Sequence, residues 1–351
     1  MKPIAITLGD PAGIGPEIIV KAFRAAPDAT RGAFVAGDLA ALRRGARAVC
    51  GTGQVEIPIA VIDDPLEALD LPPHCIGLLQ AAQALPALPA FGIVNAGAGR
   101  MAAQCVTWAA RAALGGEIAA LVTAPLHKEA LSAAGVMFPG HTELLQSEAA
   151  HFLGRAVQDV PVRMMLANDE LRTVLVSIHV SLRDAVAAVT TANVLETLRI
   201  THAALMRELG HAPRIGVAGL NPHAGEGGLF GREEIEAIVP AIVAARAEGI
   251  AASGPFAPDT VFMRARAKRG NAAEPGEFDV VIAMYHDQGL IPVKYLGVEK
   301  GVNVTLGLPL VRTSPDHGTA FDIAGTGRAD ASSLIEALRM ARRMTASAQD
   351  A

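Results

Sequence analysis

"VVIAMYHDQGLIPVK", residues 280–294, opens with an unbroken apolar run over residues 280–284. A run of this length, rich in β-branched residues, predicts a strand that is buried on both faces, as in parallel sheets. Three polar side chains follow the run: His286, Asp287 and Gln288. Because open α/β sheets bind ligands beyond the carboxyl ends of their strands, this stretch predicts an α/β fold with polar chemistry at a strand end.

The same rhythm of short apolar strand, turn and alanine-rich helix recurs along most of the chain. Amphipathic segments such as residues 190–209 and 232–247 separate several of the strands. Alternation of this kind predicts a mostly parallel sheet with helices on both faces. The other predicted strands cover residues 4–8, 33–36, 119–123, 162–167, 173–178 and 215–220.

The composition argues against several classes of protein. The chain has 351 residues, of which 51% are hydrophobic, enough for two domains or one large one. The formal net charge is −5 and no basic tail or stripe is present, so nucleic acid is not an expected partner. The apolar runs are too short to cross a membrane, and the three cysteines form no CxxC motif. These features predict a protein of a reducing compartment, the cytoplasm.

Three of the ten histidines share one context, because each ends or follows an apolar strand-like run. These are His179, His223 and His286. Neutral imidazoles from three strand ends could converge on one divalent ion. No HExxH or HxH motif occurs, so spacing alone leaves the alternative that each histidine is simply hydrogen-bonded at a strand end.

Several further polar residues are candidates for binding an anion. In "FPGHTELL", residues 138–145, His141 and Thr142 follow a Pro-Gly break, and Thr142 is the expected N-cap of a helix whose exposed amides suit an anion. Plain helix capping explains the same pattern. Lys294, Asn303 and Arg312 are expected in loops of the C-terminal third, where a lysine and the fork of an arginine suit phosphate or carboxylate. Each of them alone could equally be a solvated surface residue.

Two glycine-rich stretches are candidates for a nucleotide site. "GDPAGIGPE", residues 9–17, lets a backbone approach a ligand closely, but it is neither a Walker A loop nor GxGxxG. "GAGRMA", residues 97–102, matches GxGxxA but lacks a preceding central strand and lies far into the chain. It is predicted to be the entry turn of a helix, so no standard Rossmann site is expected and the cofactor-binding residues stay unassigned.

Several long motifs together resemble the 4-hydroxythreonine-4-phosphate dehydrogenase family of vitamin B6 (pyridoxal phosphate) biosynthesis. The resemblance runs from about residue 4 to 345 and rests on "GDPAGIGPE", "TAPLHKEAL", "PGHTELL", "GLNPHAGEGGLFGREE", "PDTVF", "AMYHDQGLIPVK" and "GVNVTLGLPLVRTSPDHGTAFDIAGTG". It implies an isopropylmalate-dehydrogenase-like fold of two α/β/α domains with the active-site cleft between them. The first domain is expected at about residues 1–130 plus 295–351, and the second, with the metal histidines and dimer contacts, at about 131–294.

The resemblance also implies a site for each ligand. The family is a homodimer with both subunits contributing to each active site, it uses NAD or NADP, and it binds one divalent ion (Zn, Co, Mg or Mn). The implied metal ligands are His179, His223 and His286, one of them supplied across the dimer. The implied substrate contacts are His141, Thr142, Lys294, Asn303 and Arg312. The expected general base is Lys294, Asp259 or Asp287.

The implied reaction is NAD-dependent oxidation of 4-phosphooxy-L-threonine to a 3-keto acid, which decarboxylates to 3-amino-2-oxopropyl phosphate. The segments "GLFGREE" and "PDTVF" also resemble a sister group that acts on 4-phospho-D-threonate or 4-phospho-D-erythronate, so this substrate class stays open. A metal-dependent hydrolase that uses the same histidines, and a non-catalytic phosphate-binding protein, are the alternatives from other classes.

Overall fold

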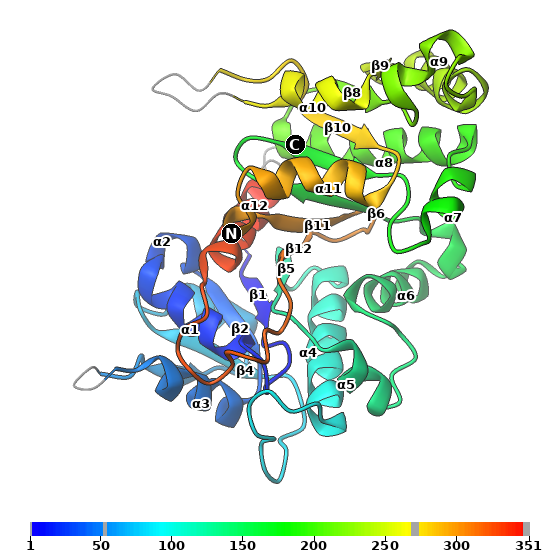
Figure 1. Ribbon diagram of the computed structural model, residues 1–351. Helices are drawn as coiled ribbons and strands as arrows, with labels where there is room; N and C mark the ends of the chain where they lie inside the picture. The colour runs from blue at the N-terminus through cyan, green and yellow to red at the C-terminus, as the bar shows by residue number, and fades with distance from the viewer. Residues whose placement is uncertain (1, 52–54, 268–273, 347–351) are drawn as a thin grey trace. The chain divides into compact units, whose positions relative to one another are not determined.

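The computed structural model describes residues 2–51, 55–267 and 274–346. The chain divides into two compact units (Figure 1): unit 1 is Met1–Pro161 with Leu308–Thr345, and unit 2 is Val162–Gly307 with Ala346–Ala351. These divisions differ from the expected boundaries near residues 130 and 294. Helices α5 (Lys128–Ala133) and α6 (His141–Leu153) pack on α4 (Ala96–Leu114), which keeps them in unit 1. Strand β11 (Val302–Leu306) pairs with β6 (Arg163–Ala167), which keeps it in unit 2.

Unit 1 is built on parallel strands in the order β3-β4-β2-β1-β5-β12. Every residue of the central strand β1 is buried although successive side chains point to opposite faces, so helices or loops cover both faces. The predicted strands at residues 4–8, 33–36 and 119–123 are confirmed. The strands of unit 1 are β1 (Ile4–Thr7), β2 (Ala33–Gly37), β3 (Ile59–Val61), β4 (Ile76–Gln80), β5 (Ala120–Thr123) and β12 (Arg312–Pro315).

Helix α4 of unit 1 begins at a side-chain cap. The side chain of Asn95 accepts a hydrogen bond from the Ala98 amide at the start of α4, as an N-cap residue does. "GAGRMA" therefore lies in the first turns of α4, and its prediction as a helix entry is confirmed. A Cβ at Gly99 would lie 2.0 Å from the carbonyl oxygen of Ala130, so this glycine allows α4 and α5 to approach closely. The remaining helices of unit 1 are α1 (Gly15–Ala25), α2 (Pro27–Thr30), α3 (Leu39–Val49), η1 (Pro65–Leu69), η2 (Val157–Asp159) and α12 (Ser332–Ala346).

Unit 2 contains strands in the order β11-β6-β7-β10-β8-β9. The strands from β7 to β9 run parallel, whereas β6 pairs antiparallel with both β7 and β11. The antiparallel pair β6–β7 is joined by a tight turn, in which the side chain of Asn168 accepts from the amides of Glu170 and Leu171. The remaining strands of unit 2 are β7 (Arg172–Leu175), β8 (Ile215–Ala218), β9 (Ala252–Phe256) and β10 (Val280–Ala283).

Strand β10, formed by the apolar run that begins at Val280, lies inside the core of unit 2. All four of its residues are buried, with α11 (His286–Tyr295) and α10 (Pro258–Ala265) packed beside it (Figure 1). Leu175, Val281 and Leu290 belong to one apolar cluster that joins this helix layer to the strands. The α/β fold class is thereby confirmed. The remaining helices of unit 2 are α7 (Leu182–Ala187), α8 (Thr191–Leu209), η3 (Pro222–Gly228), η4 (Glu234–Ile238), α9 (Val239–Ala247) and η5 (Val298–Lys300). None of the helices in the described ranges has the length and apolar character needed to cross a membrane.

Candidate functional site

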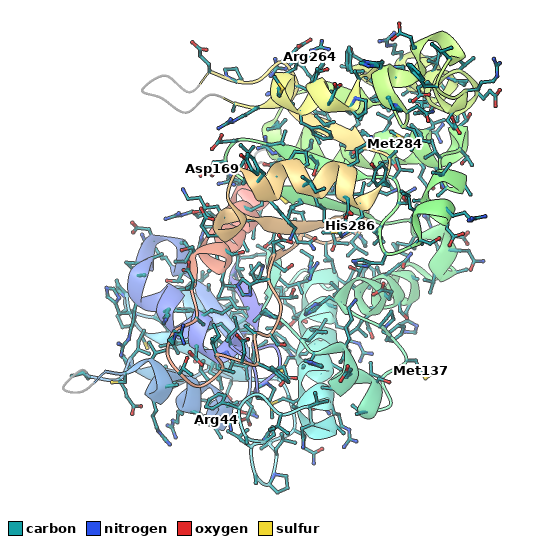
Figure 2. The ribbon with its side chains drawn as sticks, in the orientation of Figure 1. Arg44, Met137, Asp169, Arg264, Met284 and His286 are labelled. Carbon is teal, nitrogen blue, oxygen red and sulfur yellow. The ribbon has the colours of Figure 1, made fainter. Side chains whose placement is uncertain are left out.

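The three strand-end histidines follow three neighbouring strands of unit 2. His179 follows β7, His286 follows β10 and His223 follows β8, and the sheet order places β10 between the other two. The ring centroids of His179 and His286 are 5.8 Å apart, a separation at which two imidazoles can bind one ion. Figure 2 shows His286 where the chain passes from β10 into α11. The fold thus brings at least two of the predicted metal ligands together.

A carboxylate orients one of these imidazoles. Nδ1 of His286 lies 2.7 Å from Oδ1 of Asp287. A carboxylate that accepts from one ring nitrogen fixes the tautomer and leaves the other nitrogen free to bind a metal. Asp287 is exposed and His286 is half-buried, so Nε2 of His286 is suited to face a ligand.

His223 lies at the beginning of an uncommon backbone segment. Residues 223–227 all have positive φ, including the non-glycine residues His223 (52°), Ala224 (54°) and Glu226 (42°). Left-handed backbone costs a non-glycine residue roughly 1–2 kcal/mol, so this turn persists only because its surroundings hold it. Backbone strain of this kind is frequently found at functional sites.

One chain offers nitrogen donors of the kind that the predicted metal site needs. Nitrogen donors of histidine suit Zn²⁺ and related divalent ions, and the pair His179–His286 provides two of them. Within residues 2–51, 55–267 and 274–346, no group of three His, Cys, Asp or Glu side chains is close enough to hold a metal ion. The described residues thus bring together two imidazoles of a suitable donor type, one fewer than the three protein ligands of a typical catalytic zinc site.

A pocket of about 460 Å³ opens on unit 2 beside the histidine segments. Its lining includes His223, Asp259 and Asp287, three of the residues singled out from the sequence. Asp259 lies in the first turn of α10, and its side chain is exposed. The pocket thus places two of the three expected general bases beside one expected metal ligand.

Lys294 and Asn303 lie on regular elements, which corrects the prediction that they are in loops. Lys294 is in the last turn of α11 and Asn303 is in β11. Helix α11 continues through both Gly289 and Pro292, although these residue types are common in turns. A Cβ at Gly289 would lie 2.5 Å from Cδ2 of Leu175, so this glycine lets α11 approach β7.

A second group of predicted binding residues lies in unit 1. Arg312, the first residue of β12, is buried and donates from Nε (3.2 Å) and Nη2 (2.8 Å) to the Thr123 hydroxyl. Arg312 was also expected in a loop, but it pairs with β5 opposite Leu121. Burial lowers the pKa of Arg312 to about 10, and the negative charge of Glu143 opposes this shift. The guanidinium therefore keeps its charge at neutral pH and is suited to pair with an anion.

His141 and Thr142 form the beginning of α6 in the same unit. The N-cap is Gly140, so the prediction that Thr142 caps the helix is wrong; both residues already belong to its first turn. Burial, and then the positive charge of Arg312, lower the pKa of His141 well below its usual value, while a hydrogen bond with the Ala124 backbone opposes the shift. Nε2 of His141 is enclosed and has no hydrogen-bond partner among the described residues. An enclosed acceptor beside a buried arginine calls for a polar partner.

The lowered pKa of His141 predicts how stability depends on pH. Between the folded and the unfolded pKa the unfolded chain binds more protons, so His141 makes the free energy of unfolding fall as the pH drops below about 6.5. His141→Gln should make the free energy of unfolding depend less steeply on pH. The reason is that the number of protons taken up on unfolding would fall by up to one. Urea unfolding followed by circular dichroism between about pH 5 and 8 measures this slope. Equal slopes for the two proteins would contradict a histidine that stays neutral when folded.

Two residues that the structure places in these groups, Thr123 and Gln288, have no role that the sequence alone assigns. Thr123 binds Arg312, and its only signal was its position at the end of a predicted strand. Gln288 lines the pocket of unit 2, and its side chain forms two hydrogen bonds to backbone groups far apart in the sequence. No local pattern distinguishes such a glutamine from a solvated one.

Comparison with known proteins identifies the family. The family model described as pyridoxal phosphate biosynthetic protein PdxA matches residues 29–341. A 4-hydroxythreonine-4-phosphate dehydrogenase of Beijerinckia indica is 52% identical over 97% of this chain and 95% of its own. A D-threonate 4-phosphate dehydrogenase of Salmonella typhimurium is 46% identical over 98% of this chain and 99% of its own. The crystal structure of 4-hydroxythreonine-4-phosphate dehydrogenase from Klebsiella pneumoniae superposes with a TM-score of 0.85 at 40% identity, covering 98% of this chain and 100% of that one. With its motifs, its fold and these relatives in agreement, the chain belongs to the PdxA family.

Proposed function

We propose that this protein is an NAD-dependent dehydrogenase that oxidises the C3 hydroxyl of 4-phosphooxy-L-threonine in pyridoxal phosphate biosynthesis. The observation that carries the proposal is the arrangement of His179, His223 and His286 after three adjacent strands of unit 2. In the reaction the C3 hydrogen leaves as hydride to NAD⁺ and the hydroxyl proton passes to a base. The resulting 3-keto acid loses CO2 and takes up a proton, which gives 3-amino-2-oxopropyl phosphate.

The phosphate and carboxylate of this substrate need fixed cations and hydrogen-bond donors. Arg312 offers a buried guanidinium held by Thr123, and the first amides of α6 at His141 and Thr142 face outward from a helix N-terminus. Lys294 and Asn303 are further proposed substrate contacts. Anchoring of the anionic groups would hold the C3 hydroxyl in a reactive orientation. Such positioning of the reacting groups provides much of an enzyme's rate enhancement.

The histidines are proposed to bind one divalent ion. Such an ion would act as a Lewis acid and lower the pKa of the substrate hydroxyl. Asp287 is engaged in orienting His286 at 2.7 Å, which makes it a weaker choice for the general base. Lys294 and Asp259 are the two remaining choices, and Asp259 lines the same pocket as His223. The acceptor must lie within hydrogen-bond reach of the hydroxyl whose proton it removes.

The third donor of the ion is proposed to come from a second copy of the chain. Large apolar side chains are exposed right beside the histidine segments: Val180 and Leu182 follow His179, and Leu229 and Phe230 follow the His223 turn. Leu182 is 64% exposed and Leu229 is 73% exposed, which is costly for a monomer in water. A symmetric dimer would bury these side chains and could bring a histidine of each copy into the other's site.

The decisive test is an NAD reduction assay followed at 340 nm. The protein is expected to reduce NAD⁺ with 4-phosphooxy-L-threonine and to lose this activity when a chelator removes divalent ions. The comparison substrates are 4-phospho-D-threonate and 4-phospho-D-erythronate, because one close relative is named for D-threonate 4-phosphate. If kcat/KM is higher with either of them than with 4-phosphooxy-L-threonine, that compound is the preferred substrate and the alternative function is correct. Release of phosphate without NADH would instead indicate a hydrolase, and NADP⁺ serves as the cofactor control.

A further inference from the structure

The amide of Gln288 joins two histidine segments of unit 2. Its Oε1 accepts from the backbone N–H of Met284 at 2.7 Å, and its Nε2 donates to the carbonyl oxygen of Gly219 at 2.8 Å. Met284 lies two residues before His286, and Gly219 lies four residues before His223. One side chain therefore bridges the end of β10 to the loop that follows β8.

A primary amide suits both of these hydrogen bonds, because it carries an acceptor and a donor. The Met284 amide needs an acceptor and the Gly219 carbonyl needs a donor, and the two ends of the Gln288 amide provide one of each. A glutamate of the same length would keep the acceptor but point a carboxylate at the Gly219 carbonyl. A methionine of similar volume would keep neither bond.

The segments on both sides of Gln288 are fixed as well. The hydroxyl of Ser177, two residues before His179, donates to the Met284 carbonyl at 3.0 Å. On the other side, the buried carboxylate of Glu234 accepts from the backbone amides of Leu220 (2.7 Å) and Asn221 (2.8 Å). A continuous series of hydrogen bonds thus runs from the His179 segment through the His286 segment to the loop that carries His223.

The strained turn at His223 explains why this loop needs to be held. Residues 223–227 are left-handed, a conformation that His223, Ala224 and Glu226 do not favour on their own. Both ends of the loop leading to that turn are tied: Gly219 by Gln288, and Asn221 by Glu234, whose Oε2 also accepts from Nδ2 of Asn221 at 2.9 Å. With either tie removed, the turn can relax to a right-handed backbone and carry the His223 imidazole away.

We propose that Gln288 is a positioning residue that holds the segment carrying His223 and the segment carrying His286 each in the place it needs for metal binding. The proposal rests on the proposed function, because it takes these histidines as metal ligands. Gln288 itself binds no metal; it acts through the backbone on both sides. Residues that orient metal ligands typically contribute about 10- to 100-fold to metal affinity.

The test measures the binding of Co²⁺ to the purified full-length protein by competition with a chromogenic chelator. Gln288→Met and Gln288→Glu should each weaken Co²⁺ binding by about 10- to 100-fold and alter the visible spectrum of the bound ion, which reports its coordination geometry. Gln146→Met is the matched control, because the side-chain amide of Gln146 in α6 also forms two hydrogen bonds to the backbone, donated by its Nε2 to the carbonyls of Val157 and Val160 in unit 1. That control should bind Co²⁺ as the wild type does.

The outcomes separate this inference from the proposed function. If His286→Ala binds Co²⁺ as tightly as the wild type, the histidines are not the ligands and the proposed function fails. If His286→Ala loses Co²⁺ while both Gln288 variants bind normally with an unchanged spectrum, only the positioning role is wrong. Should Gln288→Met not fold, Gln288→Glu decides, since it keeps the bond to Met284. Loss of the folded state in both variants would show that the amide supports the whole unit, and would overturn the inference.

Discussion

Replacing His286 with alanine is expected to lower kcat/KM for NAD reduction by roughly 10³-fold or more. Lewis-acid stabilisation by a metal is worth several kcal/mol, and each 1.36 kcal/mol changes the rate tenfold. The change removes one of three proposed nitrogen ligands. His286 is half-buried at the beginning of a helix and β10 is buried without it, so the fold should persist. Initial rates at 340 nm together with circular dichroism measure both effects.

The control for this variant is His211→Ala, a histidine that is exposed in the loop before β8. It should retain wild-type rates. Near-normal NADH production by His286→Ala in the presence of a chelator would contradict the metal role.

The same variant tests whether the active site is shared between two chains. His286→Ala and His223→Ala should each be inactive alone. If these two histidines serve one site from different chains, a mixed dimer contains one intact site. Random exchange of subunits would then restore about a quarter of the wild-type activity. No restoration after exchange, with mixed dimers shown by mass spectrometry, would place both histidines in the site of one chain.

Replacing Arg312 with methionine is expected to raise KM for the phosphorylated substrate by roughly 100-fold or more while KM for NAD changes little. Arg312 is buried, keeps its charge because burial lowers its pKa only to about 10, and is held by Thr123. Loss of several charge-assisted hydrogen bonds, each worth about 1.5–3 kcal/mol, accounts for this size. Initial rates at saturating NAD and varied substrate give KM for the substrate. Initial rates at saturating substrate and varied NAD give KM for NAD.

Arg312→Lys sharpens this prediction. A lysine keeps the charge but lacks the planar fork, so it should recover only part of the affinity for substrate. Arg207→Met, at an exposed position near the end of α8, is the control and should leave both constants unchanged. Equal increases in the KM of substrate and of NAD for Arg312→Met would contradict an anion-binding role.

The site could be predicted from the sequence to the extent that its residues follow local patterns. The apolar run ending at Met284 indicated a buried strand, and the histidine after it indicated a strand-end site; both lie where expected. The prediction that Lys294 lies in a loop failed because Gly289 and Pro292 are typical of turns, whereas here Gly289 permits close packing of α11 on β7. The sequence could assign no role to Gln288 or Thr123, because their hydrogen-bond partners are 69 and 189 residues away in the chain.

The sequence by itself determined the α/β class, the strand ends that carry polar side chains and, through its motifs, the family. These follow from hydrophobic periodicity and from residues next to one another in the chain. Only the tertiary structure decided that β10 lies between β7 and β8, so that His179, His286 and His223 follow adjacent strands. It also decided the left-handed turn at His223 and the hydrogen bonds of Gln288 that hold its loop. The physical reason is that strand order and backbone strain are fixed by contacts between distant segments, which no local pattern encodes.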